Sequence, residues 1–192
     1  MAAAATLARA SARFCSLASQ KRLFSPRSHL WVGLTRDTPL HGGLAPPRAS
    51  WKLSVGITER GFEDIGSLTG LTALVQTGAP VALGQPLLRL AWEGHKISDG
   101  DELYHTTWQN IEGEFMVTAP VAGTLVSLHE GAYDASSRPM ELDATDCLAV
   151  LHVDRPALQS APGLVDAGAY RAHLQTLEPG MFGGDGYGGS FG

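Results

Sequence analysis

Residues 78–123 read GAPVALGQPLLRLAWEGHKISDGDELYHTTWQNIEGEFMVTAPVAG. The stretch opens with a G-x-x-V-x-x-G pattern, continues in an apolar run and contains the dipeptide Asp99-Gly100. Asp-Gly between two β-rich runs is a strong hairpin signal, because glycine tolerates positive φ and aspartate tolerates it better than most residues. The sequence therefore predicts a long β-hairpin that reverses over residues 98–101, with turns at Gly84 and Gly123 on either side.

Length and composition predict one folded domain with unpacked ends. A chain of 192 residues with 44% hydrophobic content and a mean hydropathy of -0.01 can bury a single core. We expect residues 1–50 to be a targeting sequence and linker, and residues 51–178 to be the domain. Residues 179–192 are expected to be a flexible glycine-rich tail.

Charge is divided unevenly along the chain. Residues 1–50 hold seven basic residues and one acid, whereas the rest hold seven basic and eighteen acidic residues, a net charge of −11. An acid-poor start with Arg9 and Arg13 in a helix-forming stretch is typical of a mitochondrial transit peptide, which predicts the matrix as the location; a plain basic tail is the alternative. The acidic remainder argues against nucleic acid binding. Arginines interrupt the apolar stretches too often for a membrane span.

No residue pattern indicates a catalytic or metal centre. Cys15 lies in the expected targeting sequence and Cys147 stands alone after it, which leaves no disulfide or cysteine-based metal site in a mature chain. The histidines lack metal-site spacing, and we interpret the expected approach of His95 and His105 across the hairpin as coincidence. No P-loop motif is present. We therefore expect a protein that is not an enzyme and holds no metal.

Strand and helix signals surround the hairpin. Residues 51–57 (WKLSVGI) alternate apolar and polar side chains, which predicts a strand, and Thr58 can cap a short helix after it. The other expected elements are strands at residues 71–76, 124–129 and 147–153 and a helix at residues 164–177.

The order of these motifs resembles that of the lipoyl/biotinyl carrier domains, and within them the H protein of the glycine cleavage system. The resemblance covers residues 51–177 and implies a mostly β, lipoyl/biotinyl-type barrel-sandwich hybrid (H-protein-like) with an extended hairpin and a C-terminal helix. In that family a lysine on a hairpin carries lipoate. The matching features, in order, are Val55-Gly56-Ile57-Thr58, the G-x-x-V-x-x-G turn, Ala119-Pro120-Val121-Ala122-Gly123, a loop with Pro139, a core strand and Ala169-Tyr170.

The carrier lysine that the resemblance implies depends on which motif is aligned. From the leading turn, the family's E-x-x-K pattern matches Glu93-Gly94-His95-Lys96, which makes Lys96 the candidate lipoyl-lysine. From the motif at residues 119–123, the lysine position falls on Glu112, which has no amine and cannot be lipoylated. The alignments differ by sixteen residues, so the hairpin carries an insertion relative to the family. An ordinary solvated lysine is the plain interpretation of Lys96.

Two functions are compatible with these residues. The first is a non-catalytic binding or structural module without a cofactor, which contacts a protein partner in the mitochondrial matrix through the lengthened hairpin. The second is a lipoate carrier of the glycine cleavage type, lipoylated on Lys96, with the decarboxylase, aminomethyltransferase and dihydrolipoyl dehydrogenase of that system as partners. Four large apolar residues of the hairpin either fold back on the domain or face a partner, and the hazard of an exposed aromatic strand modestly favours the partner. They are Trp92, Trp108, Phe115 and Met116.

Overall fold

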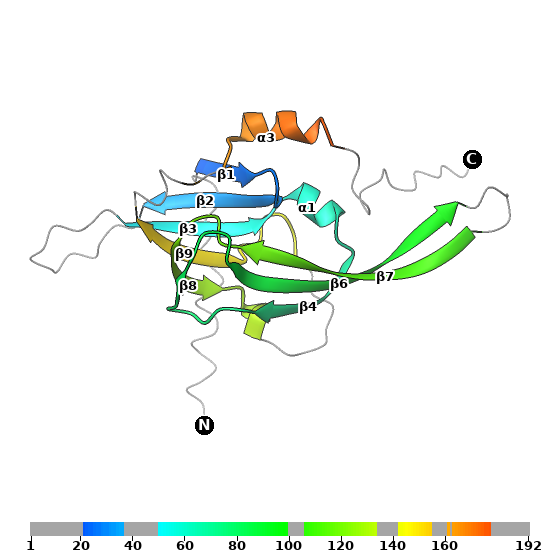
Figure 1. Ribbon diagram of the computed structural model, residues 1–192, viewed down its shortest axis with the longest axis horizontal. Helices are drawn as coiled ribbons and strands as arrows, with labels where there is room; N and C mark the ends of the chain where they lie inside the picture. The colour runs from blue at the N-terminus through cyan, green and yellow to red at the C-terminus, as the bar shows by residue number, and fades with distance from the viewer. Residues whose placement is uncertain are drawn as a thin grey trace, which may run out of the picture.

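The computed structural model describes residues 21–36, 50–99, 106–133, 142–154, 161 and 163–177. In these residues the protein is mostly β, with two antiparallel sheets and few helices (Figure 1). The mostly β class expected from the sequence is therefore confirmed. The expected tail at residues 179–192 and the loop with Pro139 lie outside the described residues.

The larger sheet has six strands, and every neighbouring pair is antiparallel. In spatial order they are β1 (Lys21–Ser25), β2 (Leu30–Arg36), β3 (Ser50–Ile57), β9 (Ala149–Asp154), β8 (Gly123–Leu128) and β5 (Pro80–Val81). The last strand of the chain, β9, pairs with β3 on one side and β8 on the other. It therefore joins the N-terminal strands to the rest of the sheet.

The smaller sheet has three antiparallel strands in the order β4 (Ser67–Ala73), β6 (Pro86–Asp99) and β7 (Thr106–Thr118). β6 and β7 form the predicted hairpin, and its distal part projects beyond both sheets (Figure 1). The helical elements are α1 (Glu59–Glu63), the 3-10 helix η3 (Glu130–Tyr133) and α3 (Ala167–Leu174). None of the helices in the described part of the chain has the length and apolarity that a bilayer crossing requires.

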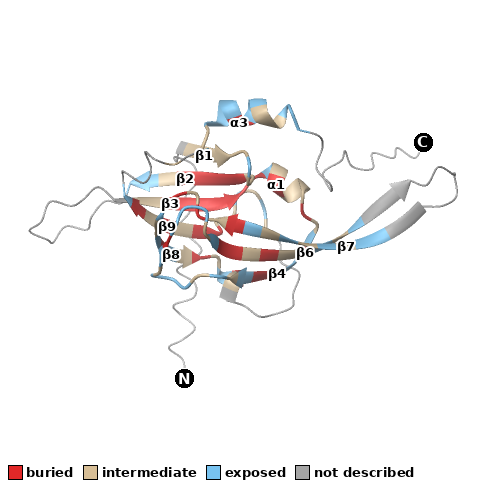
Figure 2. Cartoon of the chain, viewed as in Figure 1, coloured by how far each residue is buried: buried red, intermediate tan, exposed pale blue. Residues whose placement is uncertain are grey.

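Apolar residues of both sheets form one core. Val55 of β3, Leu151 of β9 and Leu90 of β6 are fully buried members of the same cluster. Figure 2 shows the buried residues along the central strands, whereas the described residues of the hairpin become exposed away from the sheets. The core therefore supports the base of the hairpin.

The expectation that residues 1–50 lie outside the domain is wrong for residues 21–36. These residues form β1 and β2, and β2 pairs with β3 from Leu30↔Ile57 to Arg36↔Trp51. Leu30, Trp31 and Val32 are at most 1% exposed. The basic residues of this segment indicated a leader, but the first four residues of β2 are buried and its charged end, at Arg36, is exposed.

The hairpin reverses later than residues 98–101. Its ladder continues to the pairs Ser98↔Thr107 and Asp99↔Thr106, so Ser98 and Asp99 belong to β6, and residues 100–105 lie outside the described residues. The register is fixed in the core by pairs such as Leu90↔Phe115, and a one-residue slip would turn these apolar side chains to solvent. This constraint outweighs the local Asp-Gly signal. The same register places His95 opposite Asn110, and His105 lies outside the described residues.

Glycines mark turns at the entrance of the hairpin and a close contact at its exit. Gly78 and Gly84 have φ of 87° and 76°, which confirms the two turns of the G-x-x-V-x-x-G pattern. Gly123, in contrast, is the first residue of β8 and not a turn residue. A Cβ atom there would lie 2.6 Å from the carbonyl oxygen of His152. The close approach of β8 to β9 therefore requires glycine.

The other expected elements are present with shifted ends. β3 and the α1 helix capped by Thr58 are confirmed, since Thr58 Oγ1 accepts a hydrogen bond from Gly61 N at 3.2 Å. β4 begins four residues before the expected start at residue 71 and ends three residues before the expected end at residue 76. β9 begins two residues after Cys147. α3 is shorter than expected because Asp166 caps it, accepting from Ala169 N at 2.9 Å.

Candidate binding surface on the β6–β7 hairpin

Lys96 and Glu112, the two candidate carrier positions, lie on opposite strands of the hairpin. The backbone of Lys96 pairs with Gln109, three residues before the last ladder residue Asp99. Glu112 pairs with Glu93, closer to the core. The structure therefore places neither position in the chain reversal. It also separates Lys96 from Glu112, which the two alignments had made alternatives for one site.

The exposed face of the hairpin base is rich in carboxylates. Residues directly opposite each other in an antiparallel pair share a face, and alternate residues of a strand share that face too. Ala91, Glu93, Glu112 and Glu114 thus lie on one side, in the pairs Ala91↔Glu114 and Glu93↔Glu112. The three glutamates are exposed. We call these four residues the acidic face.

A shallow groove of about 460 Å³ lies at the acidic face. All four residues of the face line it, together with Thr69 of β4, and Trp92 and Gly113 border it. Thr69 lies at a β-bulge, where the register of β4 against β6 shifts between Leu68 and Gly70. The lining of the groove therefore combines the small apolar residue Ala91 with three carboxylate side chains.

The charges of the acidic face are only partly compensated. Glu114 Oε1 lies 3.2 Å from Nη1 of Arg89, but the side chains are 52% and 41% exposed, so this ion pair contributes little stability. Glu93 and Glu112 are directly opposite each other, an arrangement that is destabilising for like charges. Within the described residues, no ion pair to either carboxylate is present. The acidic face can thus accept cationic groups.

The opposite face of the hairpin attaches it to the domain. Leu90 is fully buried, and Trp92 and Phe115 pack against the core. The indole of Trp92 covers Gly113, its cross-strand partner, so closely that a Cβ atom at Gly113 would overlap the ring. Trp92 and Phe115 therefore fold back on the domain and are partly buried. Met116 is 39% exposed, and the side chain of Trp108 is outside the description.

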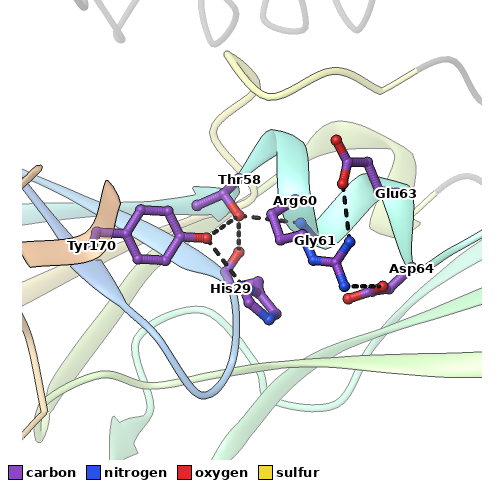
Figure 3. Close-up of polar contacts among 7 residues, drawn as sticks. All are labelled: His29, Thr58, Arg60, Gly61, Glu63, Asp64 and Tyr170. Atoms are coloured by element: carbon purple, nitrogen blue, oxygen red, sulfur yellow. Dashed lines mark hydrogen bonds and ion pairs between the residues drawn. The ribbon is translucent and has the colours of Figure 1, made fainter. Parts of the chain in front are cut away.

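A second polar site, which the sequence analysis missed, joins three elements of the domain (Figure 3). Thr58 Oγ1 donates to the carbonyl oxygen of His29 at 3.0 Å, so the contact of 2.9 Å between Thr58 Oγ1 and Tyr170 Oη is made by the tyrosine proton. Tyr170 Oη then accepts from Nδ1 of His29 at 3.0 Å. A closed ring of hydrogen bonds links the β1–β2 turn, α1 and α3.

Burial shifts the pKa values of two members of this ring. Burial lowers the pKa of His29 below 6.5, opposed by the nearby carboxylate of Asp64. Burial also raises the pKa of Tyr170 above 10.0, opposed by the hydrogen bond with Thr58. Both shifts favour the neutral forms. The ring is therefore suited to holding these elements together.

Nearby, Arg60 is paired within its own helix. Its Nη1 lies 3.1 Å from Glu63 Oε2 and its Nη2 lies 3.2 Å from Asp64 Oδ1. The described residues contain no group of three or more His, Cys, Asp or Glu side chains placed to hold a metal ion. Comparisons of the chain with protein-family models, with curated proteins and with solved structures found no significant match. The hairpin and its acidic face remain the best candidate for a functional surface.

Proposed function

We propose that this protein is a non-enzymatic binding module of the mitochondrial matrix, with an H-protein-like fold of the lipoyl type, that does not carry lipoate. One observation carries the proposal. Lys96 is paired with Gln109 inside the ladder, and residues 100–105 between the two strands, with the sequence GDELYH, contain no lysine. Lipoylation in the carrier family uses an amine at a sharply turned strand tip, and glutamate at position 112 cannot replace it.

Several features support a barrel-sandwich hybrid of this type. The two antiparallel sheets share one core, and the G-x-x-V-x-x-G turn has glycines of positive φ before a long hairpin. A short helix capped by Thr58 follows β3, and a helix containing Tyr170 lies near the C-terminus. These elements occur in the order that the resemblance implies.

The proposed location rests on residues 1–20. They contain Arg9 and Arg13 and no acidic residue. Because Lys21 begins β1, a presequence that is removed without loss of a strand must end before that residue. We therefore propose that the matrix-targeting sequence lies within residues 1–20 and not in the whole of residues 1–50.

Intact-mass measurement tests the absence of lipoate. The full chain is produced in cells that contain an active lipoate ligase, in parallel with a known lipoyl domain as the positive control. We expect an unmodified mass for the wild type and for Lys96→Arg. A lipoyl adduct on the wild type that disappears in Lys96→Arg contradicts the proposal.

A lipoate carrier modified on Lys96 is the second candidate function. The position of Lys96 near the free end of a projecting hairpin favours it, as does the absence of any other lysine after residue 52. Such a carrier would dock on the glycine cleavage enzymes. An adduct at Lys96, with reduction by dihydrolipoyl dehydrogenase, would establish this function in place of the first.

A further inference from the structure

The outer edge of β7 can accept another strand. Among the described residues, β7 has one strand neighbour, β6, and it ends the order of the smaller sheet. An edge strand presents unpaired backbone N–H and C=O groups that can pair with an added strand. β7 is thirteen residues long, and part of it extends past the core. Its backbone therefore provides a template for an extended segment.

The negative charge of the acidic face determines which kind of strand can be added to the edge of β7. Glu112 and Glu114 lie two residues apart on β7, and side chains at this spacing are about 7 Å apart on one face of a strand. A strand paired with β7 has the same spacing, so its alternate residues meet these two carboxylates. Glu93 on β6 lies directly behind Glu112 and adds a third negative charge.

Charge argues against a second copy of this chain as the occupant. Edge-to-edge pairing of two β7 strands would bring glutamates on the same sheet face toward one another, and like charges across a strand pair are destabilising. Charges on an edge also prevent self-association in many sheets. A cationic partner brings no such repulsion between glutamates across the strand pair. It also offsets the repulsion between Glu93 and Glu112.

We propose that β7 and the acidic face bind an extended, arginine-bearing segment of a partner protein, which adds to the sheet as a fourth strand. Its alternate arginines contact Glu112 and Glu114, since the planar guanidinium group forms paired hydrogen bonds with a carboxylate. Ala91, a small apolar residue in the lining of the groove, can contact the aliphatic part of these side chains. This inference rests on the proposed function, because it specifies the partner of that binding module.

Binding of synthetic peptides to the full chain tests the proposal. The probe alternates arginine with threonine, and the reference peptide has the same composition with its arginines in one block. We expect the alternating peptide to bind more tightly, and its affinity to fall as salt rises. The variant Glu112→Gln/Glu114→Gln should weaken binding by roughly tenfold. The control Glu130→Gln/Asp154→Asn removes two exposed charges elsewhere and should leave affinity unchanged.

Backbone pairing is tested with two N-methylated probes. In a strand added to an edge, alternate N–H groups point toward the sheet and the others toward solvent. Methylation of one alternate set should abolish binding, and methylation of the other set should be tolerated. Equal effects of both sets, or equal binding of the alternating and block peptides, would overturn the proposal. Dimerisation of the chain without peptide binding would assign the edge to a second copy instead.

The peptide-binding experiment and the intact-mass measurement test the two proposals independently. If peptide binding depends neither on the two glutamates nor on the set of N-methylated groups, and Lys96 is unmodified, the arginine-bearing partner is excluded. The proposal of a non-lipoylated binding module then still stands. A lipoyl adduct at Lys96, with peptide binding intact, removes the proposed function while leaving the acidic face as a docking site.

Discussion

Three residues, His29, Thr58 and Tyr170, form a ring of hydrogen bonds that fixes the β1–β2 turn. His29 has φ of 47°, a left-handed conformation that is uncommon for a residue other than glycine. Its carbonyl oxygen accepts from Thr58 N at 2.8 Å as well as from Thr58 Oγ1. The ring of Tyr170 also stacks on Phe24 with a centroid distance of 4.9 Å. A turn of β1–β2 is thus fixed both by its backbone and by its side chains.

Protonation of His29 is expected to destabilise the domain. Its pKa is lowered in the folded state, so the unfolded chain binds the proton more readily. The stability is fully present above pH 6.5, the ordinary value, and is lost as the pH falls from there through the folded pKa. We expect the free energy of unfolding to fall more steeply over this interval in the wild type than in His29→Asn. Urea denaturation at several pH values measures the difference.

The substitution to asparagine is chosen because asparagine tolerates the left-handed conformation and does not titrate. Asp64, Arg60, His173 and Glu63 also act on His29 and are retained in both proteins. Parallel pH profiles of the two proteins would show that the acid sensitivity comes from other groups.

At the scale of the strands, both sheets contain a tryptophan lying over a glycine of the neighbouring strand. Trp31 of β2 pairs with Gly56 of β3, and Trp92 of β6 pairs with Gly113 of β7. In each case a Cβ atom on the glycine would overlap the indole. Glycine normally weakens a strand, but here it admits a large ring flat against the backbone. The two pairs therefore position the N-terminal hairpin and the β6–β7 hairpin.

Gly113→Ala is expected to destabilise the domain by about 1–3 kcal/mol, because the added methyl group displaces a tightly packed indole. Chemical denaturation followed by tryptophan fluorescence measures both the loss and the altered environment of Trp92. Gly70→Ala in β4 is the matched control. A Cβ atom there has its closest contact at 4.0 Å, so we expect little change. Similar unfolding free energies for the two variants would contradict the packing argument.

The sequence predicts an element correctly where the residues that determine it are neighbours in the chain. Residues 51–57 alternate and Thr58 caps the next helix, and both predictions are confirmed because they involve neighbouring residues. The position of the hairpin reversal is set by pairs near the core, such as Leu90↔Phe115, so the local Asp99-Gly100 signal misplaced it. The groove at the acidic face depends on that register and could not be derived before it was known.

For the molecule as a whole, the largest difference from the sequence prediction is the start of the domain. Composition indicated a basic leader through residue 50, but residues 21–36 contribute two strands to the larger sheet. Their apolar residues, in LFSP and LWV, are separated by a turn and could have indicated a hairpin. The ring of His29, Thr58 and Tyr170 joins segments 29 to 141 residues apart, and no local pattern predicts such contacts.

Removal of residues 1–36 is expected to abolish stable folding, whereas removal of residues 1–20 should leave it nearly unchanged. The longer deletion takes Leu30, Trp31 and Val32 from the core and exposes the edge of β3. Three buried side chains contribute about 1.5–3 kcal/mol each, against a total stability of about 5–15 kcal/mol. Circular dichroism with thermal unfolding compares the three proteins. Equal melting temperatures for all of them would show that β1 and β2 are dispensable.

The central position of β9 in the larger sheet determines when the sheet can be completed during folding. In the strand order of the larger sheet, residues 21–57 and residues 123–128 are joined through this strand, which ends at Asp154. Most of the polypeptide must thus be synthesised before these strands can pair, and long-range pairing of this kind is slow. Until β9 is available, the apolar strands stay exposed to aggregation, which a chaperone can prevent.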